Sequence, residues 1–102
     1  MADYTWAAEA KDLIPGTMLA ARVDGKALLL VNLEGELYAM SDFCTHQKCY
    51  LHNGKLEGKV LTCPCHSADF DVTTGAALSA PAKDPLPMYS VKVEGNDILV
   101  EI

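Results

Sequence analysis

The sequence predicts an all-β fold, a small antiparallel β-sandwich or barrel that carries one loop insertion. Pairs of turn-forming residues recur at short intervals and separate short apolar runs, which is typical of antiparallel strands. No internal repeat, low-complexity tract or linker interrupts the chain. We therefore expect a single domain over residues 1–102, although a chain of this length buries only about two-thirds of the surface that its unfolded form exposes.

The first elements follow from two turn pairs. Three consecutive strands are expected, at residues 17–23, 26–32 and 36–40. Asp24-Gly25 and Glu34-Gly35 separate them, and an Asp-Gly pair favours a two-residue turn because its residues can take positive φ. The run Leu28–Val31 predicts a buried strand, or one packed on both faces. Before these strands, Tyr4–Ala8 fits a strand and Ala7–Leu13 fits a helical turn, and the sequence leaves both open.

The carboxyl-terminal segment predicts a closing hairpin. Apolar and polar residues alternate over 89–94, Gly95-Asn96 supplies a turn, and residues 98–102 form the second strand. The preceding segment, residues 79–87, contains too many prolines for a central strand. Between the two β regions lies the insertion, residues 44–75, which contains every cysteine and histidine of the chain. We expect ligation, hydrogen bonds and crosslinks to hold this insertion, because it offers few apolar residues.

The charge balance excludes some partners. Eight Lys and Arg residues face 14 Asp and Glu residues, so the formal net charge is −6, which repels nucleic acid and anionic lipid. No apolar run approaches the roughly 20 residues that a membrane-spanning helix needs, and the residues from Met1-Ala2-Asp3 onward do not show a basic segment followed by a hydrophobic stretch. We expect a cytoplasmic protein with no membrane span and no nucleic-acid partner. A basic protein partner would complement this negative charge, and the need for ordinary solubility explains the negative charge equally well.

Two short motifs predict a metal centre. The first is Cys44-Thr45-His46 and the second is Cys63-Pro64-Cys65-His66. Two thiolates and two imidazoles can hold a tetrahedral zinc ion, or they can divide between the two irons of a 2Fe-2S cluster. Zinc modules usually pair Cys with Cys and His with His along the chain. Here each motif carries one Cys and one His, which favours the cluster, although ligand chemistry alone leaves zinc as a rival.

From residue 44 to residue 93 the sequence resembles small Rieske iron-sulfur proteins. The resemblance includes both Cys/His loops and three further motifs: Asn53-Gly54, Glu57-Gly58 before a short apolar strand, and Phe70-Asp71-x-x-Thr74-Gly75. It implies a Rieske-type β fold in which residues 44–75 bind one 2Fe-2S cluster. It also implies that residues 79–87, with Pro81, form a loop that shields the cluster.

The resemblance assigns the ligands. Cys44 and Cys63 would bind one iron, and His46 and His66 would bind the other. Neutral imidazole ligands raise the reduction potential to roughly −150 to +300 mV, against about −400 mV for plant-type clusters with four cysteines. The resemblance therefore implies transfer of single electrons at moderate potential.

Two additional cysteines, Cys49 and Cys65, resemble a cystine found in Rieske subunits of respiratory and photosynthetic quinol-oxidising complexes. Most soluble Rieske ferredoxins lack it. A disulfide closing a loop of this size contributes about 3 kcal/mol in a chain-entropy estimate. We expect the bridge to form and to lock the two loops together, although thiols are usually kept reduced in the cytosol.

Residues around the ligands are expected to tune the centre. In the quinol-oxidising subunits, a Ser and a Tyr after the second motif donate hydrogen bonds to cluster sulfur. Ala68 and Phe70 occupy those positions here and cannot donate, whereas Ser67 is a candidate donor from one place earlier. We predict a potential below the quinol-oxidising range. Gln47 and Lys48 follow His46 and are candidates for partner docking.

His52 matches no ligand position, and we expect it to be a solvated loop residue. The sequence as a whole predicts a Rieske-type ferredoxin, an electron-transfer protein and not itself an enzyme. It would accept electrons from a flavoprotein or other reductase and pass them to an oxygenase or another terminal acceptor. Two alternatives stay open: the small subunit of a larger reductase such as nitrite reductase, and a structural zinc or redox-sensing module that uses Cys49 and Cys65.

Overall fold

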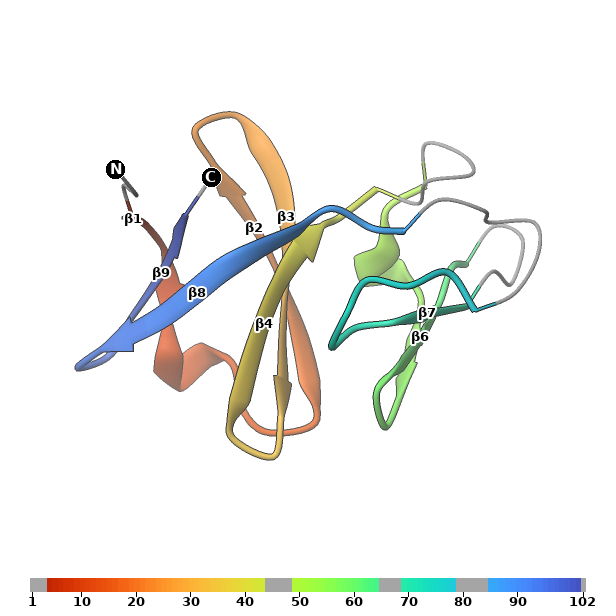
Figure 1. The fold of residues 1–102 in the computed structure, drawn as a ribbon. Coiled ribbons are helices and arrows are strands. Elements are labelled where there is room, and N and C mark those ends of the chain that lie inside the picture. Colours follow the sequence, from red (N-terminus) through yellow and green to blue (C-terminus); the bar gives the residue numbers. More distant parts are fainter. Residues whose placement is uncertain (1–3, 44–48, 65–68, 79–84, 102) are drawn as a thin grey trace.

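A computed structural model describes residues 4–43, 49–64, 69–78 and 85–101 of the protein. Their strands form two antiparallel sheets, which confirms the predicted fold class (Figure 1). The larger sheet has six strands in the order β1-β9-β8-β4-β3-β2, and contacts between β1 and β2 bring its two edges together into a barrel. Its strands are β1 (Tyr4–Glu9), β2 (Thr17–Val23), β3 (Lys26–Leu33), β4 (Glu36–Ser41), β8 (Met88–Glu94) and β9 (Asp97–Glu101).

The hairpin turns lie where the sequence predicts them. Asp24 and Gly25 have φ angles of 49° and 80°, and Glu34 and Gly35 have φ angles of 52° and 97°. Positive φ at both central residues is the geometry that a two-residue turn needs to match the twist of its strands. The predicted strands β2, β3 and β4 are therefore confirmed, with β3 and β4 each one residue longer than expected.

The amino-terminal segment contains both elements that the sequence left open. Strand β1 pairs with β9, with an irregularity in register between Trp6 and Ala8. A short 3-10 helix, η1 (Ala10–Asp12), follows it directly. At the other end of the chain, β8 and β9 form the predicted closing hairpin.

The smaller sheet was predicted only in part: the resemblance includes a short apolar strand after Glu57-Gly58, which is β6 (Val60–Thr62), but not the other two strands. The sheet consists of β5 (Lys55–Glu57), β6 and β7 (Asp69–Asp71), and the 3-10 helix η2 (Leu51–Asn53) precedes it. The expectation that few apolar residues hold this part of the chain is wrong. Leu51, Leu61, Phe70 and Val72 are all fully buried, so packing as well as ligation is available to position the loops.

Strand β3 separates two hydrophobic cores. Leu28 and Leu30 face the barrel interior, and Leu29 and Val31 face the smaller sheet; all four side chains are buried, which confirms a strand packed on both faces. The barrel core comprises Ala7, Ala8, Leu13, Val23, Leu28, Leu30, Ala39, Ile98 and Val100. The junction core comprises Leu29, Val31, Met40, Leu51, Leu61, Cys63, Phe70, Val72 and Leu86.

Candidate metal centre

The two ends of the first predicted ligand loop lie side by side. We call the residues that join them, 42–43 and 50–51, the neck of the loop. Strand β4 ends at Ser41, and an antiparallel bridge pairs Phe43 with Tyr50. The backbone N–H of Leu51 donates to the carbonyl oxygen of Asp42 over 2.7 Å. The two ends of the segment 43–50 are therefore held beside each other, next to the fully buried Leu51.

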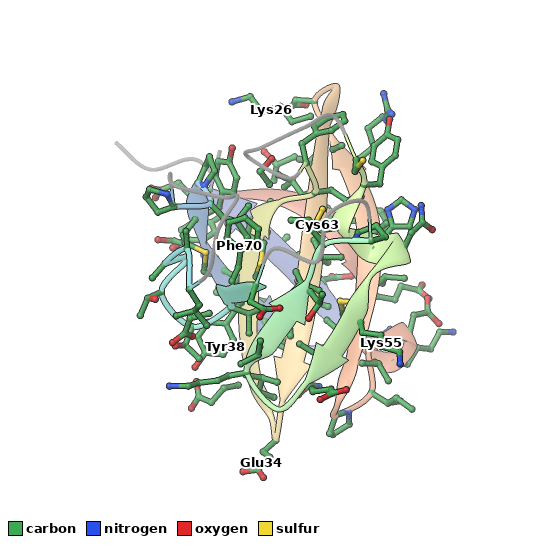
Figure 2. The ribbon with its side chains drawn as sticks, turned by 90° about the vertical axis from the view of Figure 1, so that its right-hand side faces the viewer. Lys26, Glu34, Tyr38, Lys55, Cys63 and Phe70 are labelled. Atoms are coloured by element: carbon green, nitrogen blue, oxygen red, sulfur yellow. The ribbon has the colours of Figure 1, made fainter. Side chains whose placement is uncertain are left out.

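The second predicted loop joins two strands of the smaller sheet. Thr62 at the end of β6 pairs with Asp69 at the start of β7, and the Thr62 hydroxyl donates to Asp69 Oδ1 over 2.7 Å. Cys63 begins the loop with only 1% of its surface exposed, and it belongs to the junction core together with Leu51. In Figure 2, Cys63 and Phe70 lie near the middle of the view, whereas Lys26 lies near its top and Glu34 at its bottom.

The structure tests the predicted site only in part. Of the predicted ligands, Cys63 is described and buried, while Cys44, His46 and His66 lie outside the described residues. Cys49 is half-buried against the junction core. Phe70 lies inside that core as a fully buried side chain. The other predicted residues also lie outside the described ranges: Gln47, Lys48, Cys65, Ser67 and Pro81.

The Pro-rich segment is anchored on both sides. Before it, the Leu78 N–H donates to the Asp69 carbonyl over 2.8 Å; after it, the Leu86 N–H donates to the Gly75 carbonyl over 2.7 Å. Leu86 is buried in the junction core, and its described neighbours at 85 and 87 lie outside the strands, as the sequence predicts. One end of the segment is thus attached to β7, and the other end is attached to the turn that follows β7.

A charged turn supports this sheet. Oδ1 of Asp71 accepts hydrogen bonds from the Thr73 backbone N–H over 2.9 Å and from the Thr73 hydroxyl over 2.6 Å. Lys59 Nζ lies 3.4 Å from Asp71 Oδ2. The hydrogen bond from the Thr73 hydroxyl is the largest influence that holds the pKa of Asp71 below its ordinary value of 3.8, and Lys59 adds to it against the opposing effect of burial.

Sequence reasoning missed the role of one histidine. His52 is more than a solvated loop residue, because its Nδ1 lies 2.5 Å from Oδ2 of the buried Asp42. The two residues are ten positions apart, on either side of the first loop. No local spacing rule relates residues across a loop, so the sequence carried no signal for this contact.

The described residues bring the bases of the predicted loops together at the junction core, through Cys49, Leu51 and Cys63. In the described part of the chain, no three His, Cys, Asp or Glu side chains gather as a metal site, since three of the four predicted ligands lie outside it. The described ranges also contain no helix long and apolar enough to cross a membrane. Cys63, buried at the base of a predicted ligand loop and beside a β-barrel, fits the class of small iron-sulfur protein that the ligand spacing predicts.

The chain belongs to the Rieske 2Fe-2S domain family, whose family model matches residues 3–90. It is 40% identical over 91 residues to the ferredoxin component of the naphthalene 1,2-dioxygenase system of Pseudomonas putida, covering 89% of this chain and 88% of that protein. The structure resembles the ferredoxin of carbazole 1,9a-dioxygenase from Nocardioides aromaticivorans IC177, with a TM-score of 0.90, 35% identity and 96% of each chain covered.

A second similar structure was solved as a complex of reduced oxygenase and oxidized ferredoxin in carbazole 1,9a-dioxygenase. Its matching chain has a TM-score of 0.88 and 33% identity, with 96% of this chain and 92% of that chain covered. Together, family membership and these relatives show that the protein is a Rieske-type ferredoxin with one 2Fe-2S cluster. It is an electron carrier and not a catalytic enzyme.

Proposed function

We propose that this protein carries one electron at a time from a reductase to the terminal oxygenase of a multicomponent dioxygenase. The observation that carries the proposal is the likeness, over nearly the full length of both chains, to ferredoxin components of such systems. The complex of oxygenase and ferredoxin supports an oxygenase as the acceptor. A flavoprotein or another reductase is the donor that this role requires.

The proposed ligands are Cys44 and Cys63 for one iron, and His46 and His66 for the other. The described residues fit this role, because Cys63 is buried in the apolar junction core, which would shield a bound cluster from solvent. The bound cluster supplies a site for one electron, with its charge stabilised at the iron that has neutral ligands.

The chain's own residues hold that cluster between two supported loops. The Phe43–Tyr50 bridge closes the first loop, and the pair Thr62 and Asp69 closes the second. The buried apolar side chains below them exclude water from the thiolate side. Gln47 and Lys48, beside His46, are proposed to contact the partner protein.

We also propose a disulfide between Cys49 and Cys65. Cys49 is half-buried against the junction core, close in sequence to the neck of the first loop. Such a bond would join the two ligand loops covalently. Counting thiols in denaturant on the oxidised protein tests it: the bridge predicts no reactive thiol beyond those of the ligands, and two additional thiols would contradict it.

The reduction potential should lie below the range of quinol-oxidising Rieske subunits. Phe70 is packed in the junction core and offers no hydroxyl, so one stabilising donor to cluster sulfur is missing. Ala68 removes a second, and Ser67 is the remaining candidate. Protein-film voltammetry tests this proposal, and a strongly positive midpoint potential would overturn it.

We further propose that residues 1–102 act as one domain in the cytoplasm. Strand β3 contributes to both hydrophobic cores, which supports folding of the barrel and the cluster-binding part as one unit. The acidic balance of 14 Asp and Glu residues against eight Lys and Arg residues suits a protein partner with a basic docking face.

The direct test is an electron-transfer assay with purified components. The protein, isolated without oxygen, is reduced by a dioxygenase reductase and NADH and then mixed rapidly with an oxidised Rieske oxygenase. The proposal expects reoxidation of the ferredoxin with one electron per molecule. A colourless protein with stoichiometric zinc would support the zinc alternative, and a protein that cycles only within a stable reductase complex would support the subunit alternative.

A further inference from the structure

A buried carboxylate lies at the neck of the first loop. Asp42 is 2% exposed, and both of its oxygens are engaged by one residue. Oδ1 accepts the backbone N–H of His52 over 2.9 Å, and Oδ2 lies 2.5 Å from His52 Nδ1. Because an ionised carboxylate oxygen can only accept, this contact assigns the donor role to Nδ1, in a charge-assisted hydrogen bond.

The backbone of Asp42 is attached on both sides as well. Its N–H donates to the carbonyl of Ala27 at the start of β3 over 3.1 Å, and its carbonyl accepts the N–H of Leu51 over 2.7 Å. His52 follows Leu51 in η2. Asp42 therefore joins three parts of the chain: the barrel, the end of β4, and the helix that follows the first loop.

The rings of Phe43, Tyr50 and His52 form a row beside one another. The Phe43 and Tyr50 ring centroids are 4.8 Å apart, and those of Tyr50 and His52 are 5.3 Å apart. The His52 side chain is 36% exposed, whereas the Asp42 side chain that it contacts is only 3% exposed. The ring contact with Tyr50 supports the His52 ring from one side, and burial of the carboxylate strengthens the hydrogen bond.

The neck is therefore sensitive to the loss of one donor. If the His52 ring no longer donates, one oxygen of a buried carboxylate loses its partner, and an unpaired buried charge is far more costly than a lost surface contact. Relief would require Asp42 to move toward water, and Asp42 lies two residues before Cys44. The strain would fall on the segment that contains Cys44 and His46.

We infer that Asp42 and His52 form a clasp that positions the first ligand loop, so that His52 is a positioning residue for the cluster although it binds no iron. The inference rests on the proposed function, since it requires ligands in residues 44–48. It assigns a role to the histidine that the ligand pattern leaves unused.

The test compares two substitutions at one position in the cluster-loaded protein. His52→Leu removes the donor, and we expect cluster release into an iron chelator to become about tenfold faster, as is typical when residues that orient metal ligands are lost. His52→Asn offers an amide N–H near the position of Nδ1. We expect its release rate to stay within about twofold of the original protein, because the hydrogen bond is restored.

Trp6→Phe is the matched control. It also removes a single side-chain donor to an aspartate, the 3.2 Å bond from Trp6 Nε1 to Asp97 Oδ1, but in the barrel. We expect no change in cluster release or in midpoint potential for this variant, whereas His52→Leu should change both. A merely structural loss of stability would not alter the potential of the cluster that remains bound.

The outcomes separate clearly. Equal release rates for His52→Leu and the original protein would overturn the clasp, and so would equal impairment of His52→Leu and His52→Asn. If His52→Leu cannot be isolated with its cluster, Asp42→Asn replaces it: faster release than in His52→Asn supports the clasp, and equal rates contradict it. Failure of the original protein to hold any cluster would contradict the proposed function instead.

Discussion

The barrel and the cluster-binding part of this protein are stabilised in different ways. Each barrel hairpin joins neighbours in sequence through a two-residue turn, as β2–β3 and β3–β4 do. The smaller sheet has strands of only three residues. Its side chains are buried by partners from distant parts of the chain, including Leu29 of β3 and Leu86 after the Pro-rich segment.

This difference shows how a small chain can support a metal centre. Local hairpins make the barrel, and one face of its strand β3 then serves as the base on which the cluster-binding part packs. Cys63 belongs to that packed layer. A substitution in the junction core should therefore disturb the metal centre, while an equivalent substitution in the barrel core should disturb mainly the barrel.

The largest effect is expected from removing the buried thiol. Cys63→Ser replaces a soft thiolate by a hydroxyl, so we expect complete loss of the Rieske signal in electron paramagnetic resonance spectra. Far-ultraviolet circular dichroism should still show the β-barrel, because its core contains no cluster ligand. A Cys63→Ser protein with a full Rieske signal would contradict the ligand proposal.

The sharpest comparison uses two adjacent leucines on β3. Leu29 and Leu30 are both buried, but they face the junction core and the barrel core respectively. Each change to alanine should cost about 2–5 kcal/mol of unfolding free energy in urea titrations. Only Leu29→Ala should also speed cluster release, measured by bleaching in the presence of a chelator. Equal rates of cluster release in the two variants would contradict the claim that the junction core, and not the barrel core, supports the cluster.

The next largest effect on stability is expected from a comparison of two glycines. Gly75 and Gly95 both have positive φ, 83° and 63°. A Cβ on Gly75 would lie 2.5 Å from the Leu86 carbonyl oxygen, whereas nothing lies within 4 Å of one on Gly95. Gly95→Ala should cost about 1 kcal/mol of unfolding free energy for its backbone conformation. Gly75→Ala should cost about 1–3 kcal/mol more, because the chain must shift. Similar thermal unfolding of both variants would contradict the close packing around Gly75.

The smallest effect concerns the turn that Asp71 supports. Asp71→Asn should lower the unfolding free energy by about 1 kcal/mol at neutral pH, since it weakens the bonds from Thr73 and Lys59. Because the pKa of Asp71 is lowered on folding, its stabilisation is present above the unfolded value of 3.8 and is lost as the pH falls through the folded value.

The measurement is urea unfolding of both proteins in a series of buffers of decreasing pH. The difference in stability between Asp71→Asn and the original protein should shrink at the acid end. A difference that stays constant through that range would mean that the carboxylate charge contributes nothing to the turn.

Much of the barrel could be predicted because its signals are local. The turn pairs at Asp24-Gly25 and Glu34-Gly35 place the ends of three strands to within one residue. The apolar run Leu28–Val31 indicated a strand buried on both sides, and the two cores are the physical reason for it. The family was predicted from a resemblance that includes the two Cys/His motifs and three further motifs, and the match to the family model confirms it.

The rest depended on contacts between distant residues. Strands of three residues are too short to show a period, so β5 and β7 left no pattern in the sequence, and only the motif Glu57-Gly58 indicated β6. The pair Asp42 and His52 spans a loop that no spacing rule describes. The assignments of Cys44, His46 and His66 stay predictions, because these residues lie outside the described part of the chain.

The most direct test of the central claim is an electron paramagnetic resonance spectrum of dithionite-reduced protein isolated without oxygen, with iron and acid-labile sulfide assayed on the same sample. A Rieske 2Fe-2S centre predicts two irons and two sulfides per chain and a paramagnetic signal that appears only after reduction by one electron. A sample that contains zinc and no labile sulfide, and gives no signal on reduction, would contradict the account.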